Sequence, residues 1–269
     1  MDPRITIHVH GGIADVRLAR PDKMNAIDDA MFDALVAAGE RLRTESGLRA
    51  VVLSGEGRAF CAGLDMGNFA QMAAGTGQTS VEAHRAAGGS GPNRAQKAAL
   101  GWRAIPVPVI AAVHGVAFGG GLQVMLGADI RLVTGDAKLA VMEMRWGLVP
   151  DMSGIIRLRR LVSDDVLSEL VYAGRTFSGA EAAKIGVATR LAGDPRAAAL
   201  ALAAEIAAKN PHAVRAAKRL ANLAEDGDEA ALITAEAAEQ LNLIGSPNQI
   251  EAVRANLEKR APRFADVGE

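Results

Sequence analysis

The fold of this chain is indicated by one stretch, residues 113–129, which reads Val113-His114-Gly115-Val116-Ala117-Phe118-Gly119-Gly120-Gly121-Leu122-Gln123-Val124-Met125-Leu126-Gly127-Ala128-Asp129. The apolar run 109–113 predicts a buried strand, the three successive glycines predict a turn, and the residues from Leu122 onward predict a helix. Glycine lets a ligand approach the backbone closely, and the first N–H groups of a helix have no acceptor within it. The stretch therefore predicts a site for negative charge.

Spacing excludes two common phosphate-binding motifs. A dinucleotide-binding fingerprint needs a glycine where Val124 stands, and a phosphate loop needs lysine and a hydroxyl residue where the chain has Leu122 and Gln123. The structural alternative is that the glycines only let the helix pack closely against a strand, but three in succession are more than such packing requires. Both nucleotide-binding interpretations are therefore excluded.

Composition is that of an ordinary globular protein. The 269 residues are 49% hydrophobic and 23% charged, which is enough to bury a large core. With 30 basic and 31 acidic residues, the net charge of −1 favours neither nucleic acid nor an anionic membrane surface as a partner. A single cysteine fits a reducing compartment, and the N-terminal residues run directly into an expected strand. We expect a cytoplasmic protein.

Strands and helices alternate along the first part of the chain. Alternating hydrophobicity predicts a hairpin over 5–18, followed by a helix capped by Asp28. A buried strand is expected over 48–54, and the small and polar residues 70–93 are expected to form a mobile or partly helical lid. Further elements are expected as a helix at 94–103, a strand at 130–133, and helices opening at Ser178, Asp194-Pro195, Asn210-Pro211 and Ser246-Pro247.

Two acidic residues could carry proton chemistry. Glu143 lies among apolar residues, so its carboxylate is either paired with a base such as Arg145 or held partly desolvated with a raised pKa. Asp151 follows Pro150 and precedes an apolar helical pattern, so by itself it is predicted to be a helix N-cap.

Covalent and metal-dependent catalysis find little support. Cys61 lies between Phe60 and Ala62 with no basic neighbour in sequence, so we interpret it as a buried structural thiol. His8 and His10 share one face of a strand, but no acidic or cysteine partner stands near them, and we expect no metal site.

Four motifs carry a family resemblance: Phe60-Cys61-Ala62-Gly63-Leu64-Asp65-Met66, His114-Gly115-Val116-Ala117-Phe118-Gly119-Gly120-Gly121-Leu122, Gly147-Leu148-Val149-Pro150 and Leu257-Glu258-Lys259-Arg260. In order and spacing they resemble the enoyl-CoA hydratase/isomerase family, the crotonase superfamily, from about Ile13 to Phe264. The resemblance implies an α/β fold of the crotonase-like (ClpP/crotonase) type, a spiral of β-β-α repeats with a C-terminal α-helical trimerisation region. We therefore expect a spiral core over 1–193, a helical oligomerisation region over 194–269, and a homotrimer or homohexamer.

The same resemblance implies an acyl-CoA site. The thioester oxygen would be held by the backbone N–H groups of Leu64 and Gly120, and losing one donor of such an oxyanion hole costs on the order of 3 kcal/mol. Coenzyme A is part of the substrate, and no separate cofactor is expected. The residues expected to bind it are Arg20, Lys23, Ala26, Ala62, Asp65 and Met66.

The resemblance also locates the catalytic residues. Hydratases of the family use two glutamates, at the positions of Gln123 and Glu143, whereas dienoyl-CoA isomerases place acids at the positions of Gln123, Glu143 and Asp151. An amide can orient water but cannot exchange a proton near neutral pH, so isomerisation is favoured over hydration. The alternatives are a hydratase with weakened activity, another crotonase reaction (thioester hydrolysis, decarboxylation or C–C cleavage), or a non-catalytic acyl-CoA-binding protein.

Overall fold

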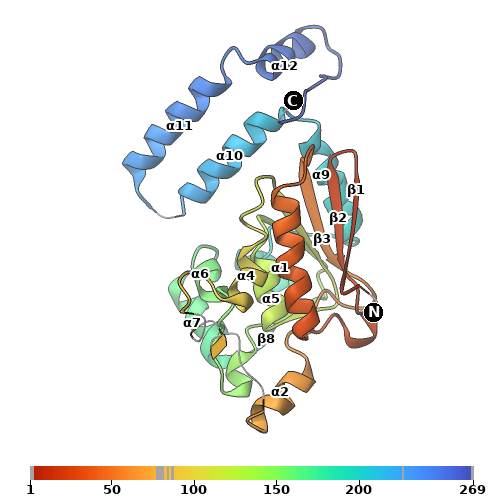
Figure 1. Ribbon diagram of the computed structural model, residues 1–269, viewed down its shortest axis with the longest axis vertical. Coiled ribbons are helices and arrows are strands. Elements are labelled where there is room, and N and C mark those ends of the chain that lie inside the picture. The colour runs from red at the N-terminus through yellow and green to blue at the C-terminus, as the bar shows by residue number, and fades with distance from the viewer. Residues whose placement is uncertain (1–2, 77–81, 84, 86–87, 226, 268–269) are drawn as a thin grey trace.

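Two β-sheets organise the computed structural model of the chain (Figure 1), which describes residues 3–76, 82–83, 85, 88–225 and 227–267. Within these residues the larger sheet has six strands in the order β1-β2-β3-β4-β6-β9, and the smaller sheet has three in the order β5-β7-β8. The larger sheet comprises β1 (Ile5–His10), β2 (Ile13–Leu18), β3 (Ala50–Gly55), β4 (Val109–Val113), β6 (Ile130–Val133) and β9 (Arg190–Leu191). The smaller comprises β5 (Val116–Phe118), β7 (Lys138–Ala140) and β8 (Thr176–Ser178).

The strand pairing is that of an α/β protein with one antiparallel edge. Strands β1 and β2 form the predicted hairpin, with Ile5 opposite Leu18, while β2, β3, β4, β6 and β9 pair in parallel. All five residues of β4 are buried, which is typical of a parallel strand covered on both faces. The predicted α/β class, hairpin and buried strands are confirmed.

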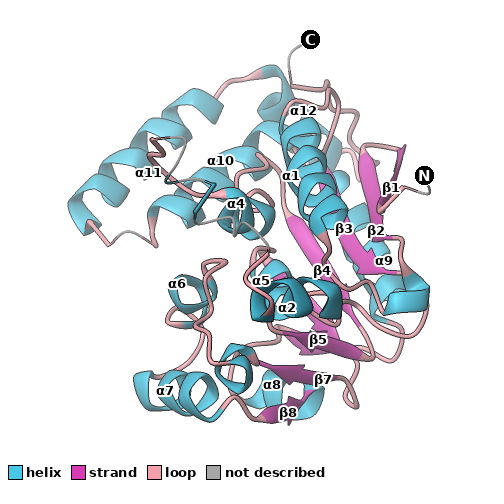
Figure 2. Cartoon of the chain, turned by 60° about the horizontal axis from the view of Figure 1, so that its bottom comes forward, coloured by secondary structure: helices cyan, strands magenta, loops and turns pink. Residues whose placement is uncertain are grey.

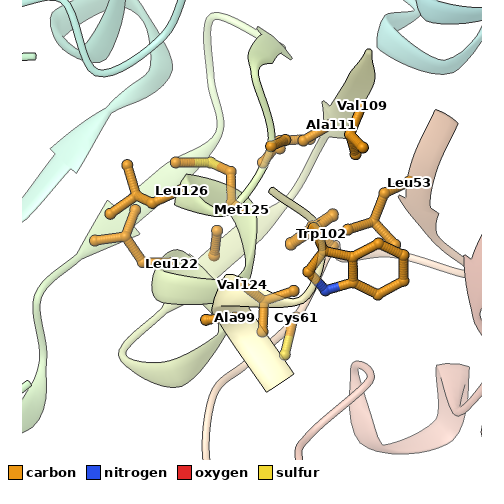
Figure 3. Packing of buried hydrophobic residues seen from close by; sticks show 14 of the residues in the cluster. Leu53, Cys61, Ala99, Trp102, Val109, Ala111, Leu122, Val124, Met125 and Leu126 are labelled. Atoms are coloured by element: carbon orange, nitrogen blue, oxygen red, sulfur yellow. The ribbon is translucent and has the colours of Figure 1, made fainter. Parts of the chain in front are cut away.

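Helices cover the two faces of the larger sheet. On one face, α1 (Asp29–Arg43), α4 (Arg94–Leu100) and α5 (Gly120–Leu126) share a hydrophobic core with alternate residues of β3 and β4, such as Leu53 and Ala111. Figure 3 shows part of this core, with Trp102 among the buried side chains of β3, β4 and α5. On the other face, Ala199 and Ala203 of α9 (Pro195–Ala207) pack against Val52. Because successive strand residues point to opposite faces, one strand supplies both cores.

The C-terminal helices begin where the sequence predicts. Asp194, Asn210 and Ser246 cap α9, α10 (Pro211–Leu223) and α12 (Pro247–Leu257), each followed by proline in the first turn, and α11 (Glu229–Leu243) lies between the last two. In Figure 1, α10, α11 and α12 lie at one end of the molecule, whereas α9 covers the sheet. The boundary between 193 and 194 stays a prediction.

The smaller sheet and the elements around it complete the fold. Figure 2 shows β5, β7 and β8 side by side, with α7 (Asp164–Ala173) and α8 (Gly179–Lys184) near them. The predicted lid segment begins within α2 (Met66–Ala73) and ends at Asn93, the N-cap of α4, but its residues 77–81, 84 and 86–87 lie outside the described residues. Among the described residues, no helix has both the length and the apolar character needed to cross a membrane.

Candidate active site

A cavity of about 410 Å³ lies where the turn between β5 and α5 meets the loop after β3. Its wall also includes α2, the short helix η2 (Glu143–Trp146) and the loop before α6 (Gly154–Leu158). Most of the lining side chains are apolar. The polar groups at its wall are therefore few, and their hydrogen bonds decide what chemistry the cavity can support.

The two predicted oxyanion-hole residues line this cavity. Leu64 follows Gly63, and Gly120 is the first residue of α5. A Cβ atom on Gly63 would lie 2.6 Å from the Phe118 carbonyl oxygen and 3.7 Å from the Gly120 nitrogen, so the two backbone segments are in close contact. Neither the Leu64 N–H nor the Gly120 N–H donates to a protein acceptor among the described residues. Two backbone donors are thus left at one wall, although their binding of a thioester oxygen stays a prediction.

The Glu143 carboxylate is desolvated and joined to Gln123. Its Oε1 accepts a hydrogen bond of 2.6 Å from the Gln123 amide, while its Oε2 is buried and has no hydrogen-bond partner among the described residues. Burial is the largest cause of a raised pKa for this carboxyl, and the negative charge of Asp151 raises it further. Of the two interpretations from sequence, the structure favours a desolvated acid, since in the described part of the chain no ion pair joins Glu143 to Arg145.

Gln123 is held in one orientation by the backbone. Its carbonyl Oε1 accepts from the N–H groups of Met152 and Gly154, both at 2.8 Å, and the residue is only 2% exposed. Because those two backbone groups can only donate, the amide nitrogen of Gln123 has to face Glu143. Sequence reasoning missed the Met152 and Gly154 donors, since backbone N–H groups have no residue-type signature.

Asp151 is not the helix N-cap that its local sequence predicts, and the proton-transfer role that the family resemblance implies for it stays a prediction. Helix α6 has Ser153 as its N-cap, and Ser153 adopts a left-handed conformation with φ of 74°, so the helix begins two residues beyond Asp151. Asp151 instead lines the cavity as an exposed residue, and the protein atoms around its carboxyl raise its pKa by desolvation. The cavity therefore contains two carboxyl groups with raised pKa values, a pattern found at sites of proton transfer.

The predicted coenzyme A segments divide into two groups. Ala62 and Met66 line the cavity, whereas Arg20, Lys23, Ala26 and Asp65 lie outside its lining. Lys23 is exposed at the end of η1 (Pro21–Lys23), and Ala26 is buried. The binding of coenzyme A by these residues stays a prediction.

Arg20 is engaged within the protein. Its guanidinium lies 2.5 Å from Asp65 and 3.5 Å from Asp28, and it donates to the Ala26 carbonyl at 3.0 Å. Asp65 also accepts from the Gly67 N–H at the start of α2, and this bond is the first cause of its lowered pKa. The structure thus assigns Arg20 and Asp65 a part in fixing the loop that carries Leu64.

An aromatic pair at the cavity wall was not predicted. The rings of Phe69 in α2 and Trp146 in η2 stack with centroids 4.3 Å apart and an angle of 23° between their planes. Both residues line the cavity, beside exposed apolar side chains such as Met66 and Val149. Aromatic residues form only 3% of the chain, so each of them could have been singled out from the sequence. The contact between Phe69 and Trp146, however, depends on tertiary structure.

Cys61 is a structural thiol, as predicted. It is fully buried, its thiol donates to the Asn25 carbonyl at 3.1 Å, and burial raises its pKa to about 12. Nucleophilic cysteines need the opposite shift. Among the described residues, the His, Cys, Asp and Glu side chains, His8 and His10 included, form no group of three that could hold a metal ion.

Comparison with known proteins gives consistent similarities. The family model described as enoyl-CoA hydratase/isomerase matches residues 8–267. A probable enoyl-CoA hydratase of Bacillus subtilis (strain 168) is 31% identical over 243 residues, covering 89% of this chain and 90% of that protein. The mitochondrial Delta(3,5)-Delta(2,4)-dienoyl-CoA isomerase of Mus musculus is 32% identical over 254 residues, covering 92% and 77%. The crystal structure of a probable enoyl-CoA hydratase/isomerase from Mycobacterium abscessus matches with a TM-score of 0.86 at 31% identity, covering 97% and 98%.

Proposed function

The chain belongs to the enoyl-CoA hydratase/isomerase family, and we propose that it shifts the carbon–carbon double bond of an enoyl- or dienoyl-CoA thioester. The predicted crotonase-like α/β fold is confirmed by the structural similarity. One observation carries the proposed reaction: Glu143 and Asp151, two carboxyl groups with raised pKa values, line one apolar cavity, and an amide stands at position 123.

The first step is the removal of a proton from C2, the carbon beside the thioester carbonyl. The C–H bond breaks, the proton passes to Glu143, and the electron pair moves through the carbonyl group to give an enolate oxygen. The N–H groups of Leu64 and Gly120 would donate to that oxygen, whose charge develops only as the proton leaves. Each such donor contributes on the order of 3 kcal/mol to the transition state.

The second step returns a proton at the far end of the unsaturated system. When a 3,5-dienoyl thioester becomes a 2,4-dienoyl thioester, the carbonyl reforms, the double bonds shift, and C6 takes a proton. Asp151, whose raised pKa favours its protonated form, would supply it. After this step Glu143 holds the proton taken from C2 and Asp151 is ionised. Release of that proton from Glu143 to water and uptake of a proton from water by the exposed Asp151 restore the starting state.

Hydration is less well supported because position 123 has no acid. The Gln123 carbonyl is occupied by Met152 and Gly154, and its amide nitrogen by Glu143. An amide takes no proton from water near neutral pH, and both of its ends are already hydrogen-bonded within the protein. Hydratase nevertheless stands in the name of the Bacillus subtilis relative, so the assay has to separate the two reactions.

A panel of acyl-CoA thioesters assayed in heavy water separates isomerisation from hydration. 2-Enoyl, 3-enoyl and 3,5-dienoyl thioesters would be followed by ultraviolet absorbance and mass spectrometry. We expect a change of conjugation with incorporated deuterium and no added mass of water. Gain of water would overturn the preference for isomerisation, and binding without turnover would identify a non-catalytic acyl-CoA-binding protein.

Asp151→Asn is expected to lower kcat for a 3,5-dienoyl thioester about 100-fold, because general acid catalysis contributes this order of magnitude. KM should change little, since the amide keeps the size and polarity of the acid. Steady-state kinetics on the purified variant check this, with the exposed Asp136→Asn as control. A kcat equal to that of the control would remove Asp151 from the mechanism.

Phe69→Ala is expected to raise KM for long acyl chains about fivefold and leave short chains nearly unchanged. The substitution removes the stack with Trp146, and aromatic pairs contribute about 0.5–1.5 kcal/mol beyond their buried area. KM measured over a chain-length series checks this, with Tyr172→Ala, a 72% exposed aromatic, as control. An equal rise for short and long chains would show that the pair does not contact the acyl group.

Exposed apolar side chains on the C-terminal helices support the predicted oligomer. Ile233 and Leu241 on α11 and Leu257 at the end of α12 are 59%, 75% and 79% exposed. Large apolar side chains gathered on helices of a globular protein favour burial against another chain. We propose that residues 194–269 contribute to a homotrimer or homohexamer.

A further inference from the structure

We propose that Gln123 is a positioning residue that occupies Oε1 of the Glu143 carboxylate and leaves Oε2 as the oxygen that exchanges protons with the substrate. The role in turnover rests on the proposed double-bond shift. The positioning itself is a property of the free protein and is argued from three observations.

The first contact fixes the amide. Met152 and Gly154 donate from their backbone N–H groups to Gln123 Oε1 at 2.8 Å each. A flipped amide would present its NH₂ group to these two buried donors, and each unsatisfied donor costs about 1–3 kcal/mol. The Gln123 side chain is also packed tightly against Gly154, where a Cβ atom would lie 2.8 Å from its Cγ. Gln123 therefore has one available orientation.

The second contact engages one oxygen of the base. Gln123 Nε2 lies 2.6 Å from Glu143 Oε1, at the short end for a bond between an N–H donor and a carboxylate. Together with the backbone N–H groups of Glu143 and Met142, this bond favours the ionised form of Glu143, against burial and against the charge of Asp151, the titratable group that raises its pKa. The glutamine thus contributes to keeping a desolvated carboxyl able to act as a base.

The third observation concerns the second carboxylate oxygen of Glu143, Oε2. Glu143 Oε2 is buried without a hydrogen-bond partner among the described residues, and a buried unpaired acceptor is unfavourable. Since Glu143 lines the cavity and Oε1 is already bonded, Oε2 is the atom left to receive a proton from a bound thioester. An ordinary glutamate offers two oxygens of equal reactivity, whereas this arrangement offers one.

Gln123→Met tests the bond by removing the amide at nearly constant volume. We expect kcat to fall at least tenfold with KM within about twofold. The acid limb of the kcat–pH profile should move to higher pH, because the lost donor favoured the ionised carboxylate and its removal raises the pKa of Glu143. A fall in kcat without movement of the acid limb would indicate a merely structural role and overturn the proposal.

A double variant, Gln123→Glu with Glu143→Gln, provides the matched control for folding. The carboxylate and amide exchange places, so the backbone donors of Met152 and Gly154 and the bond between the two side chains can all be kept. We expect a Tm close to that of the wild type but a kcat as low as that of Glu143→Gln alone, because every carboxylate oxygen now faces a donor. Recovery of more than a tenth of the wild-type kcat would overturn the proposal.

Infrared titration of the free protein separates this proposal from the proposed function. The carboxyl band of Glu143, assigned by difference from Glu143→Gln, would be followed against pH in the wild type and in Gln123→Met. We expect a higher midpoint in the variant. An unchanged midpoint would overturn the positioning role whatever the reaction, whereas absence of isomerisation by the wild type with a shifted midpoint would overturn only the proposed function.

Discussion

Replacing Glu143 by glutamine is expected to lower kcat for double-bond isomerisation about 1,000-fold or more, with little change in KM. General base catalysis contributes about 10²–10⁴-fold, and no second carboxyl in the described part of the cavity wall is placed against Gln123 to take over. Glutamine keeps the size of the side chain, and its carbonyl can still accept from Gln123. Steady-state kinetics on a 3-enoyl or 3,5-dienoyl thioester check the loss.

The same variant should be at least as stable as the wild type near neutral pH. Because burial raises the pKa of Glu143 in the folded state, its ionised form is less favourable in the folded protein than in the unfolded chain. The gain in Tm should shrink as pH falls below the ordinary range of glutamate, where the carboxyl is protonated in both states. Glu40→Gln, at an exposed position, serves as control. A wild-type kcat in Glu143→Gln would contradict the whole mechanism.

The pH dependence of the wild type follows from the same shift. The base works only when ionised, so activity should be lost as pH falls through the pKa of Glu143, above the ordinary value of 4.5. Below that pH the carboxyl carries its proton before the substrate arrives. The kcat–pH profile of the wild type, measured beside Gln123→Met, gives the position of this limb.

Local signals in the sequence were sufficient for much of the fold. The run from Val109 to the glycines predicts β4 and α5 because buried strands, glycine turns and helix formers each act over a few residues. Asp28 and Asp194 were recognisable as caps for the same reason, and both accept the backbone hydrogen bonds expected of them.

The parts that failed depend on contacts between distant segments. Asp151 looked like a cap because the left-handed conformation of Ser153, which delays α6, has no clear signal in sequence. The orientation of Gln123 is set by backbone donors about thirty residues away in the sequence. The stack of Phe69 on Trp146 joins α2 and η2, and no sequence pattern in either element indicates this contact. Residue type identified the candidate acids, but only the tertiary structure shows which of their carboxylate oxygens are hydrogen-bonded within the protein.

The role of the Leu64 and Gly120 N–H groups has to be tested by substituting a neighbouring residue, because a backbone N–H group cannot be removed by changing its own side chain. Gly63 adopts φ of 88°, and a Cβ atom there would lie 2.6 Å from the Phe118 carbonyl oxygen. Gly63→Ala must therefore shift the backbone on one or both sides of the contact. Leu64 follows one side and Gly120 stands two residues beyond the other, so a shift on either side changes the position of one donor relative to the other.

Gly63→Ala is expected to lower kcat about 100- to 1,000-fold, the loss found when an oxyanion-hole donor is removed. Isomerisation and any residual hydration should fall by similar factors, because both reactions pass through an enolate, and this distinguishes the variant from Asp151→Asn. Gly245→Ala is the matched control: its φ is 76° and no atom lies within 4 Å of its added Cβ, so it carries the backbone strain of about 1 kcal/mol without the displacement. Thermal unfolding and steady-state kinetics of the two variants are measured side by side. If Gly63→Ala loses no more kcat than Gly245→Ala, the Leu64 and Gly120 amides do not stabilise the transition state, and the reaction needs another electrophile.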